Sequence, residues 1–547
     1  MSTAKRRRGQ SLHLELPNAI SGDLPPVAAT FLILFDTKAG YTIVWERSIP
    51  GLELTDSVEF KSLPSGLHDV EEDLIYFLHN DQYAGISAFV NEPAAKSERN
   101  ALMLAVGALV PLSQGRLGRS WEHAQGLRNL ARELAQDTSE TQPLEDFWEK
   151  HRWRDGDGSE RPALDHDSSS SKEPAQNPSD ANGYARRRSR VLSSASGLIQ
   201  PDQFLPSHHP ALSLPAFLDT FGPLIFPLYK SALLRKRILL VAHAPVEQTC
   251  NFVYDISVLS HIPASIFELL PLEPLPTRLQ PLFSVGVHDI PTLRQGSRNP
   301  VKPTNDASTQ DLGYGWVACT TDDVLATKEG LYDILVTIPP PYTAQAKEKV
   351  WPRIESPRGT QVKATQRDLR RYQTLRTGMR SYTPSSKVRA NSPSPPAPHP
   401  PSQPHRLQLR QRLPATDTPP PPPSSPLPHT HEPLDDASST LSATLIEPQS
   451  WSALAYSSFI WWASAGEKRA DTADEAAHDA AILDHAPAGV SPSAPRRASA
   501  ARCRGGVEMA LVAYFHRLTA LVLGVLAQCV EAADEEAAGE EGADGGG

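Results

Sequence analysis

The chain has 547 residues, which is enough for several domains of roughly 100–200 residues each, but 52 of the residues are prolines, close to twice the usual ~5%. The formal net charge of −10 gives no overall basic field, which excludes the charge pattern typical of nucleic-acid-binding domains. The four cysteines form no C-x-x-C pair and are too few for a disulfide framework, which favours a reducing compartment.

The N-terminal segment MSTAKRRRGQS is basic, and no apolar stretch follows it closely enough for a secretory signal. Lys5–Arg8 is most simply a solvated tail, with contact to acidic lipid or nuclear import as alternatives, since four charges alone bind membranes weakly. We expect a disordered arm over residues 1–25.

The first folded block begins with a predicted β-hairpin, Phe31–Trp45. A continuous run of strand-forming residues reaches Phe35, Asp36–Gly40 supplies the turn, and the chain then returns. The segment FKSLPSG is expected to be a loop that leads to two further strands, Asp73–His79 and Tyr83–Val90.

The hydrophobic period then changes. Apolar residues recur at helical spacing over Glu98–Val110 and again over Trp121–Gln136, so both segments are predicted to be helices. The first block is therefore expected to be an antiparallel sheet with helices.

The second block alternates between helices and strands. A helix interrupted by prolines is predicted over Leu214–Leu228, a buried strand over Ile238–Ala242, a helix over Cys250–Ser260 and a strand over Leu282–Val287. Gly315–Ile338 is predicted to be strand, helix and strand, with Thr321-Asp322 at the helix N-cap. This alternation favours an α/β module with a mostly parallel sheet.

A basic, solvated helix is predicted over Thr365–Arg380, before a Pro-rich segment that includes five consecutive prolines. Apolar segments return at Leu441–Gly466 and Met509–Val530, and we expect these two to pack together or onto the second block. Met509–Val530 is long enough to span a membrane, but Arg517 lies inside it, so a buried helix is favoured over a tail anchor.

The predicted organisation thus has folded modules separated by low-complexity inserts. The ranges are a disordered arm at 1–25, an antiparallel α+β module at 26–150, a disordered insert at 151–209, an α/β module at 210–381, a Pro-rich disordered insert at 382–440, a helical part at 441–530 with a disordered loop at 467–506, and a disordered acidic tail at 531–547.

The sequence contains no recognisable chemical active site. Neither H-E-x-x-H nor a phosphate-binding glycine loop occurs, and the histidines lack metal-ligand spacing, so no metal or cofactor is expected. Ser65 has His68 and Asp69 nearby, but residues so close in sequence rarely form a triad.

Short kinase-target patterns lie in the predicted disordered stretches, where phosphorylation is sterically permitted. The candidate phosphorylation sites are Ser189, Ser392, Ser394, Thr418, Ser425 and Ser499. Arg235–Arg237 precedes a buried strand and is either a solvated helix end or a contact for an acidic partner or membrane.

Several blocks taken together resemble the LCHN-type DENN proteins, and the fungal branch in particular. The matching blocks are FLILFDTKAGYTIVWE, FKSLPSGLH, DLIYF with YAGISAFVN, SALLRKRILLVAHAPV, GWVACTTDDVLATKEGLYDILV, SWSALAYSSFIWWASAGEK and EMALVAYFHRLTAL. Their order is the family's order, and they cover about residues 27–136, 210–380 and 443–530.

The resemblance implies a longin-like module, a central α/β DENN module and a small helical C-terminal part. It also implies guanine nucleotide exchange on a Rab-type small GTPase, which would dock between the first two modules in a cytoplasmic protein, peripheral on endomembranes. Exchange requires no acid, base or nucleophile. The polar residues of the matching blocks, Lys61, Ser62, Ser65, Gly66, Arg235, Lys236 and Arg237, are the candidate GTPase contacts.

A different class of function remains open beside exchange. The same fold can serve as a non-catalytic trafficking scaffold, and the Pro-rich insert would then offer docking sites to SH3 or WW domains.

Overall fold

The computed structural model describes residues 24–154 with gaps at 37, 39, 56 and 93–101, residues 205–295 without 264–265 and 267–277, residues 315–380 without 347, residues 445–447, 473 and 477, and residues 507–543. Predictions for residues 1–23, for most of the two inserts and for most of 441–506 lie outside these ranges. At the described ends of the predicted disordered insert 151–209, Arg152 forms a bridge with Val27, and Trp153 and His209 are buried.

The described strands form one mixed sheet of ten strands in the order β10-β9-β6-β8-β7-β3-β4-β5-β1-β2. The strands are β1 (Ala29–Asp36), β2 (Gly40–Ser48), β3 (Glu72–His79), β4 (Tyr83–Glu92), β5 (Leu102–Pro111), β6 (Ile238–Val241), β7 (Gln280–Ser284), β8 (Trp316–Thr320), β9 (Ile334–Thr337) and β10 (Arg353–Glu355). The α-helices are α1 (Val58–Ser62), α2 (Ala124–Gln136), α3 (Gln142–His151), α5 (Leu214–Phe221), α6 (Ile225–Leu233), α7 (Glu247–Leu259), α9 (Ile290–Gln295), α10 (Asp323–Ala326), α11 (Gln366–Arg380) and α16 (Val507–Ala543).

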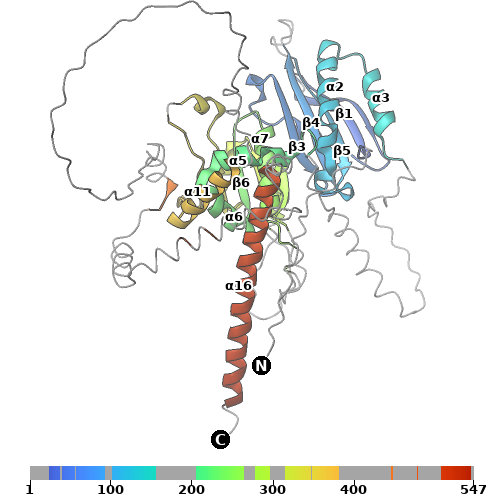
Figure 1. Ribbon diagram of the computed structural model, residues 1–547. Coiled ribbons are helices and arrows are strands. Elements are labelled where there is room, and N and C mark those ends of the chain that lie inside the picture. The colour runs from blue at the N-terminus through green and yellow to red at the C-terminus, as the bar shows by residue number, and fades with distance from the viewer. Residues whose placement is uncertain are drawn as a thin grey trace, which may run out of the picture.

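The antiparallel half of the sheet, β2-β1-β5-β4-β3, contains the predicted hairpin and the two strands that follow it. Every residue from Tyr83 to Val90 is buried, so both faces of β4 are covered. Helix α2 packs against β4 and β5, and α1 packs against β2, β3 and β4 (Figure 1).

The parallel half consists of β7, β8, β6 and β9, which pair in parallel, with β10 added antiparallel at the edge. Helix α7 packs against β3, β7 and β8 and therefore bridges the two halves. Each parallel strand is followed by a loop at its carboxyl end, and these loops lie at the same edge of the sheet. The predicted mixed α/β fold, an antiparallel sheet with helices followed by a largely parallel one, is confirmed.

The two halves join where β3 meets β7, and Phe77 opposite Phe283 is the one register pair between them in the described sheet. Phe283 is buried with a φ of 61°, a left-handed conformation that costs a residue with a Cβ roughly 1–2 kcal/mol. A register shift between Pro281 and Phe283 accompanies it. Strand β7 thus has an irregular pairing with β8 at the residue through which it also pairs with β3, in the middle of one continuous sheet.

Helix α16 begins inside the core and then leaves the body of the molecule (Figure 1). Phe515 packs against Tyr229 with 5.0 Å between ring centroids, and the Tyr229 and Thr519 hydroxyls lie 2.6 Å apart. Beyond Thr519 the helix exposes Leu521, Val525 and several other apolar side chains. The expectation of a buried helix over Met509–Val530 therefore holds only for its first part.

Four other sequence predictions differ from the structure. The segment Glu98–Val110, predicted to be helical, supplies β5, because a strand buried on both faces is apolar throughout and so matches helical spacing by chance. The predicted FKSLPSG loop begins within helix α1, and the predicted solvated helix α11 buries Tyr372 and Leu375. The acidic tail, predicted to be disordered, continues α16 to Ala543.

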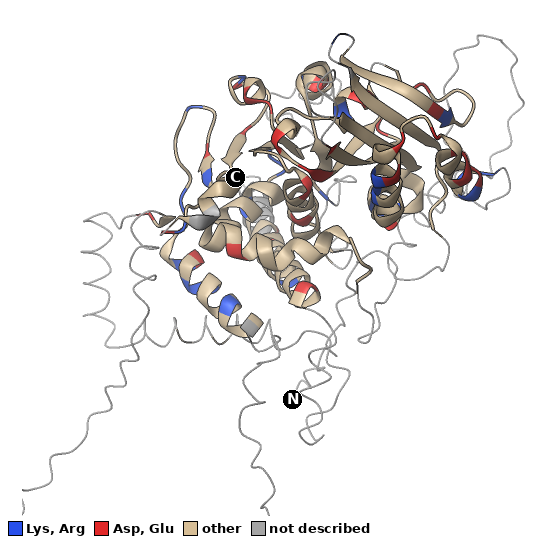
Figure 2. Cartoon of the chain, turned by 90° about the horizontal axis from the view of Figure 1, so that it is seen from above, with Lys and Arg blue, Asp and Glu red and all other residues tan. Residues whose placement is uncertain are grey.

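Charged residues of both signs are interspersed on the described helices and loops, while most of the sheet ribbon is uncharged (Figure 2). By length and composition, two described helical segments, Pro210–Leu233 and Val507–Ala533, are apolar enough to cross a membrane. Buried core helices have the same length and composition, and more than half of the most apolar stretch of each segment is buried inside this protein.

Close approach of aromatic rings to glycine in the sheet gives a stability prediction. A Cβ at Gly107 would lie 2.3 Å from the Phe31 ring, so Gly107→Ala must displace a fully buried side chain. We expect a loss of about 1–3 kcal/mol in unfolding free energy, measured by chemical denaturation. The matched control is Gly524→Ala in α16, where nothing lies within 4 Å and the change should be neutral or stabilising by up to about 1 kcal/mol. Equal effects at the two positions would contradict the described packing.

Candidate functional site

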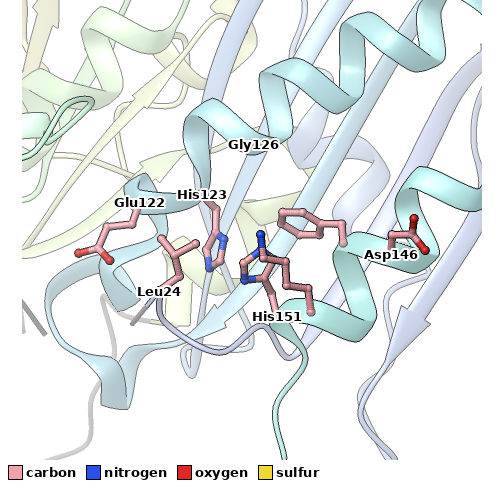
Figure 3. Close-up of a pocket in the computed structure, with 8 residues that line it drawn as sticks. Leu24, Glu122, His123, Gly126, Asp146 and His151 are labelled. Carbon is pink, nitrogen blue, oxygen red and sulfur yellow. The ribbon is translucent and has the colours of Figure 1, made fainter. Parts of the chain in front are cut away.

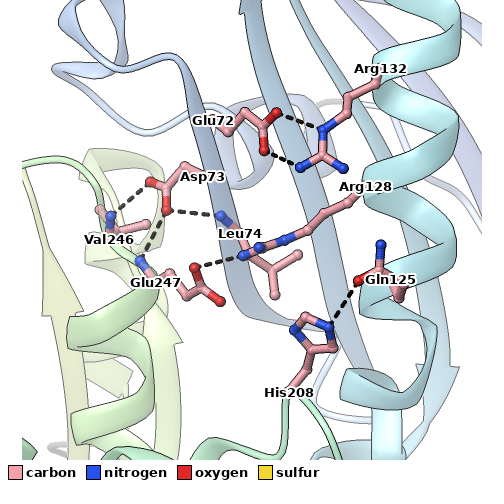
Figure 4. Close-up of polar contacts among 9 residues, drawn as sticks. All are labelled: Glu72, Asp73, Leu74, Gln125, Arg128, Arg132, His208, Val246 and Glu247. Atoms are coloured by element: carbon pink, nitrogen blue, oxygen red, sulfur yellow. Dashed lines mark hydrogen bonds and ion pairs between the residues drawn. The ribbon is translucent and has the colours of Figure 1, made fainter.

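A buried polar contact between the two halves is made by the Asp73 carboxylate at the N-terminus of α7 (Figure 4). The N-cap residue of α7 is Val246, whose side chain cannot accept a hydrogen bond. Asp73 replaces that missing cap from the antiparallel half. Its Oδ2 accepts the Val246 N–H at 2.7 Å, and its Oδ1 accepts the Glu247 N–H at 3.1 Å and the Leu74 N–H at 2.8 Å.

Burial has a stronger effect on Asp73 than its hydrogen bonds. Desolvation raises the pKa of the carboxyl from 3.8 to about 6, although the three backbone N–H groups act to lower it. The cap therefore changes its protonation close to physiological pH, while the partial positive charge of the helix N-terminus favours the ionised form.

Two ion pairs flank this cap on the α2 side (Figure 4). Arg128 of α2 donates to Glu247 of α7 at 2.6 Å and so ties the two halves together. Arg132 forms a bidentate pair with Glu72 at 2.6 Å, which is the main reason that the pKa of Glu72 is lowered. The Arg128–Glu247 pair is partly exposed, so we assign it at most about 1 kcal/mol, and the Arg132–Glu72 pair is largely exposed and screened by solvent.

A second group of contacts crosses the joint at α1 and the loop that follows it. Lys61 forms an ion pair with Asp289 at 2.8 Å and donates to the Leu78 carbonyl at 2.8 Å. The Ser65 hydroxyl donates to Asp322, which follows β8. Helix α1 is thereby fixed against the loops at the carboxyl ends of β7 and β8.

Aromatic rings continue this connection toward the hairpin. The Phe60 ring stacks on His288 with 4.0 Å between centroids, and Tyr41 lies 6.5 Å from Phe60. The pKa of Tyr41 is raised by burial and then by the charge of Asp322, which shows that the hairpin and the β8 loop are near each other.

Exposed apolar side chains lie beside these contacts. Val287 is 40% exposed and Val324 is 51% exposed, and both flank the place where Gly286 approaches Asp322. We define the seam surface as Tyr41, Phe60, Ser65, Val287, His288, Asp322 and Val324. It combines exposed apolar side chains with polar groups that the structure holds in place, as binding surfaces commonly do.

The predicted contact residues Lys61, Ser62, Ser65 and Gly66 differ in how accessible they are to a partner. Ser65 is exposed and belongs to the seam surface, and Gly66, at φ 88°, lies beside it with a virtual Cβ 3.9 Å from Ala244. Lys61 is mostly covered and already paired, and Ser62 is fully buried and therefore cannot touch a partner.

The predicted basic residues Arg235, Lys236 and Arg237 lie elsewhere. They precede β6, whereas Ala244, which faces Gly66, follows its carboxyl end, so this group and the seam surface occupy opposite ends of the strand. Arg235 donates to two backbone carbonyls, and burial lowers its pKa to about 10. Arg237 pairs with Asp333 at 2.7 Å. Two of these three side chains thus serve the fold.

The six candidate phosphorylation sites lie outside the described residues. Sequence reasoning missed Asp73, Phe60, Val287 and His288. The one available signal for Asp73 was a carboxylate at the head of an otherwise apolar strand, since a buried acid in such a position needs partners. Nothing local marks His288, because its role depends on a residue more than two hundred positions away.

A pocket of about 340 Å³ lies away from the seam, between α2, α3 and the segment that precedes β1 (Figure 3). His123 and His151 face each other there at 5.2 Å between ring centroids. His123 Nε2 donates to the Pro25 carbonyl at 2.7 Å, and burial lowers its pKa to about 4, so the ring is neutral. The histidine therefore fastens the N-terminal segment to the sheet.

Among the described residues, no group of three or more His, Cys, Asp or Glu side chains could hold a metal ion. In the seam surface the Ser65 hydroxyl donates to the Asp322 carboxylate, so this contact holds the loop after α1 against the loop after β8. The exposed apolar side chains and fixed polar groups of the seam surface form a combination that suits contact with a macromolecule.

Comparison with known proteins gives two matches to family descriptions. Residues 30–348 match "DENN domain-containing protein 11", and residues 446–545 match "Domain of unknown function (DUF4484)". The first match takes in both halves of the joint and the whole seam surface.

Individual relatives agree with the first match. The chain is 31% identical over 313 residues to DENN domain-containing protein 11 of Danio rerio and, over the same length, to that of Xenopus laevis. It is 26% identical over 380 residues to the uncharacterized protein ANR2 of Saccharomyces cerevisiae. These alignments cover 57%, 57% and 65% of this chain and 53%, 59% and 66% of the relatives, so the chain spans between half and two thirds of their length.

The raised pKa of Asp73 predicts a specific pH dependence. Between about pH 4 and pH 6 the folded protein binds more protons at this site than the unfolded chain, so stability falls as pH rises through that window. From pH 4.5 to 7, wild type should lose about 2 kcal/mol of unfolding free energy relative to Asp73→Asn, which cannot titrate. Parallel urea titrations measure this difference. A difference that is flat, or that grows in favour of wild type, would contradict the raised pKa.

Proposed function

Because the chain belongs to the DENN domain-containing protein 11 family, we propose that it is a guanine nucleotide exchange factor for a Rab-type small GTPase, and that it is of the LCHN type and of the fungal branch. DENN-domain proteins generally act on Rab-type GTPases in membrane trafficking. The observation that carries the proposal is the seam surface, a partly apolar surface built by both halves within the matched region.

Exchange of this kind is a matter of differential affinity. A factor that binds the nucleotide-free GTPase more tightly than the nucleotide-bound form lowers the affinity for GDP by the same factor, so it needs no acid, base or nucleophile of its own. A rigid surface serves this purpose well, because little ordering is needed on binding. The Asp73 cap, the Lys61–Asp289 pair and the ring contact of Phe60 with His288 supply that rigidity here.

Val287 and Val324 are the proposed anchors of the interface. Exposed apolar side chains at the centre of a binding surface contribute most when a polar rim excludes water around them, and Ser65, His288 and Asp322 provide such a rim. Gly66 would permit close approach, since nothing but Ala244 lies near its virtual Cβ. We further propose a cytoplasmic protein that is peripheral on endomembranes through its GTPase.

A panel assay tests the proposal directly. Purified full-length protein is expected to accelerate release of a fluorescent GDP analogue from at least one Rab-type GTPase. If no GTPase in the panel is accelerated but one binds stably, the protein is a scaffold, the alternative that the Pro-rich segment first suggested.

Aspartate substitutions locate the activity on the molecule. Val287→Asp and Val324→Asp should each reduce GDP release at least tenfold, because a tenfold change needs only about 1.4 kcal/mol and each variant would bury an unpaired charge. The matched control is Val350→Asp, a valine that is 47% exposed on a segment beside α5 and outside the seam surface. Equal losses in all three variants, or no loss in the first two, would remove the seam surface from the interface.

A further inference from the structure

The second part of α16 carries an apolar stripe without a partner among the described residues. Leu521, Val522, Val525, Leu526 and Val530 are between 38% and 54% exposed, and they recur at intervals of one, three and four residues, which places them on one side of the helix. Cys529 is exposed within the same run. Nothing lies within 4 Å of a virtual Cβ at Gly524, which confirms the open surroundings.

We expect another apolar surface to bury these exposed side chains. A helix that leaves the body of a protein is marginal in water without tertiary packing, and a contiguous exposed apolar stripe of this kind marks an interaction surface. Helix α16 projects beyond the body at this point (Figure 1). The first part of the same helix is held by Phe515, by the Tyr229–Thr519 hydroxyl contact and by His516, whose Nε2 donates to the Val258 carbonyl at 2.8 Å.

We propose that the cover is the segment Trp451–Ala465 of this same chain, which lies outside the described residues. Its sequence places Trp451, Leu454, Ala455, Phe459 and Trp462 at helical spacing, so one helical face would be apolar and aromatic. One family description covers residues 446–545 and so takes in both this segment and α16.

The path of the chain supports this pairing. Ile446 pairs with Ala364, and the Glu447 N–H donates to the Ala364 carbonyl at 2.9 Å. Asp368 of α11, four residues after Ala364, forms an ion pair with Lys230 of α6. Tyr229, the residue before Lys230 on α6, contacts Thr519 of α16 through its hydroxyl group. Glu447, four residues before Trp451, therefore lies beside Ala364, just before the helix that is ion-paired to α6.

Charge also favours this cover over two others. Lys468 and Arg469 follow the apolar segment, and Glu531, Asp534 and Glu535 follow the stripe, so a segment that runs alongside α16 brings opposite charges together. A parallel second copy would place the acidic residues against each other, and an anionic membrane surface would repel them. A tethered segment also has an effective concentration in the millimolar range, which a second copy does not reach.

Cys529 is a native reporter for this contact. In the intact chain, N-ethylmaleimide should alkylate Cys529 at least tenfold more slowly than a cysteine introduced by Val44→Cys, at a valine that is 49% exposed on β2, with each thiol followed by peptide mass spectrometry. Replacement of residues 450–466 by a Gly/Ser linker of equal length should bring both rates together.

Each other outcome overturns the proposal. If Cys529 of the intact chain reacts as fast as the Val44→Cys reporter, nothing covers the stripe. If N-ethylmaleimide still alkylates Cys529 slowly after the linker replacement, another occupant covers the stripe. Faster alkylation of that variant after hundredfold dilution would identify the occupant as a second copy of the chain. Flotation of the intact chain with phosphatidylserine vesicles, abolished by Leu526→Asp, would assign the stripe to a membrane.

Discussion

The Asp73 carboxylate at the N-terminus of α7 is a buried contact through which the two halves of this molecule hold each other in position. The helix cannot cap itself, because Val246 stands at its N-cap, and the buried carboxylate has no solvent to replace the α7 amides. The antiparallel half thus supplies the acceptor for the first amides of α7, and the parallel half supplies the donors for the buried carboxylate. The sheet itself joins the halves through a single register pair at a strained phenylalanine, so side chains must fix their relative position.

Most of the fold could be predicted from the sequence, because local patterns control it. The hairpin, β3, β4 and the alternation of strands and helices in the second half follow from hydrophobic period and turn residues. Segment Glu98–Val110 was misjudged because a strand buried on both faces loses its alternation. The acidic continuation of α16 to Ala543 was missed because composition alone does not show that a preceding helix continues.

The candidate site was much harder to predict. Ser65 and Gly66 were proposed as contacts through a family resemblance and are exposed, whereas Ser62 is buried and Arg235 and Arg237 bind their own chain. The residues that complete the surface, Val287, His288 and Val324, come together only when β7 and β8 lie beside α1. Contacts between positions so far apart leave no periodic signal in one sequence.

In the proposed function, both halves together form the GTPase-binding surface. Hydrogen–deuterium exchange of the full-length protein, with and without its nucleotide-free GTPase, tests this most directly. We expect slower amide exchange on both sides of the joint, in residues 57–66 of the antiparallel half and in residues 285–289 and 321–326 of the parallel half. Protection confined to one half, or centred on Arg235–Arg237 at the opposite end of β6, would contradict it.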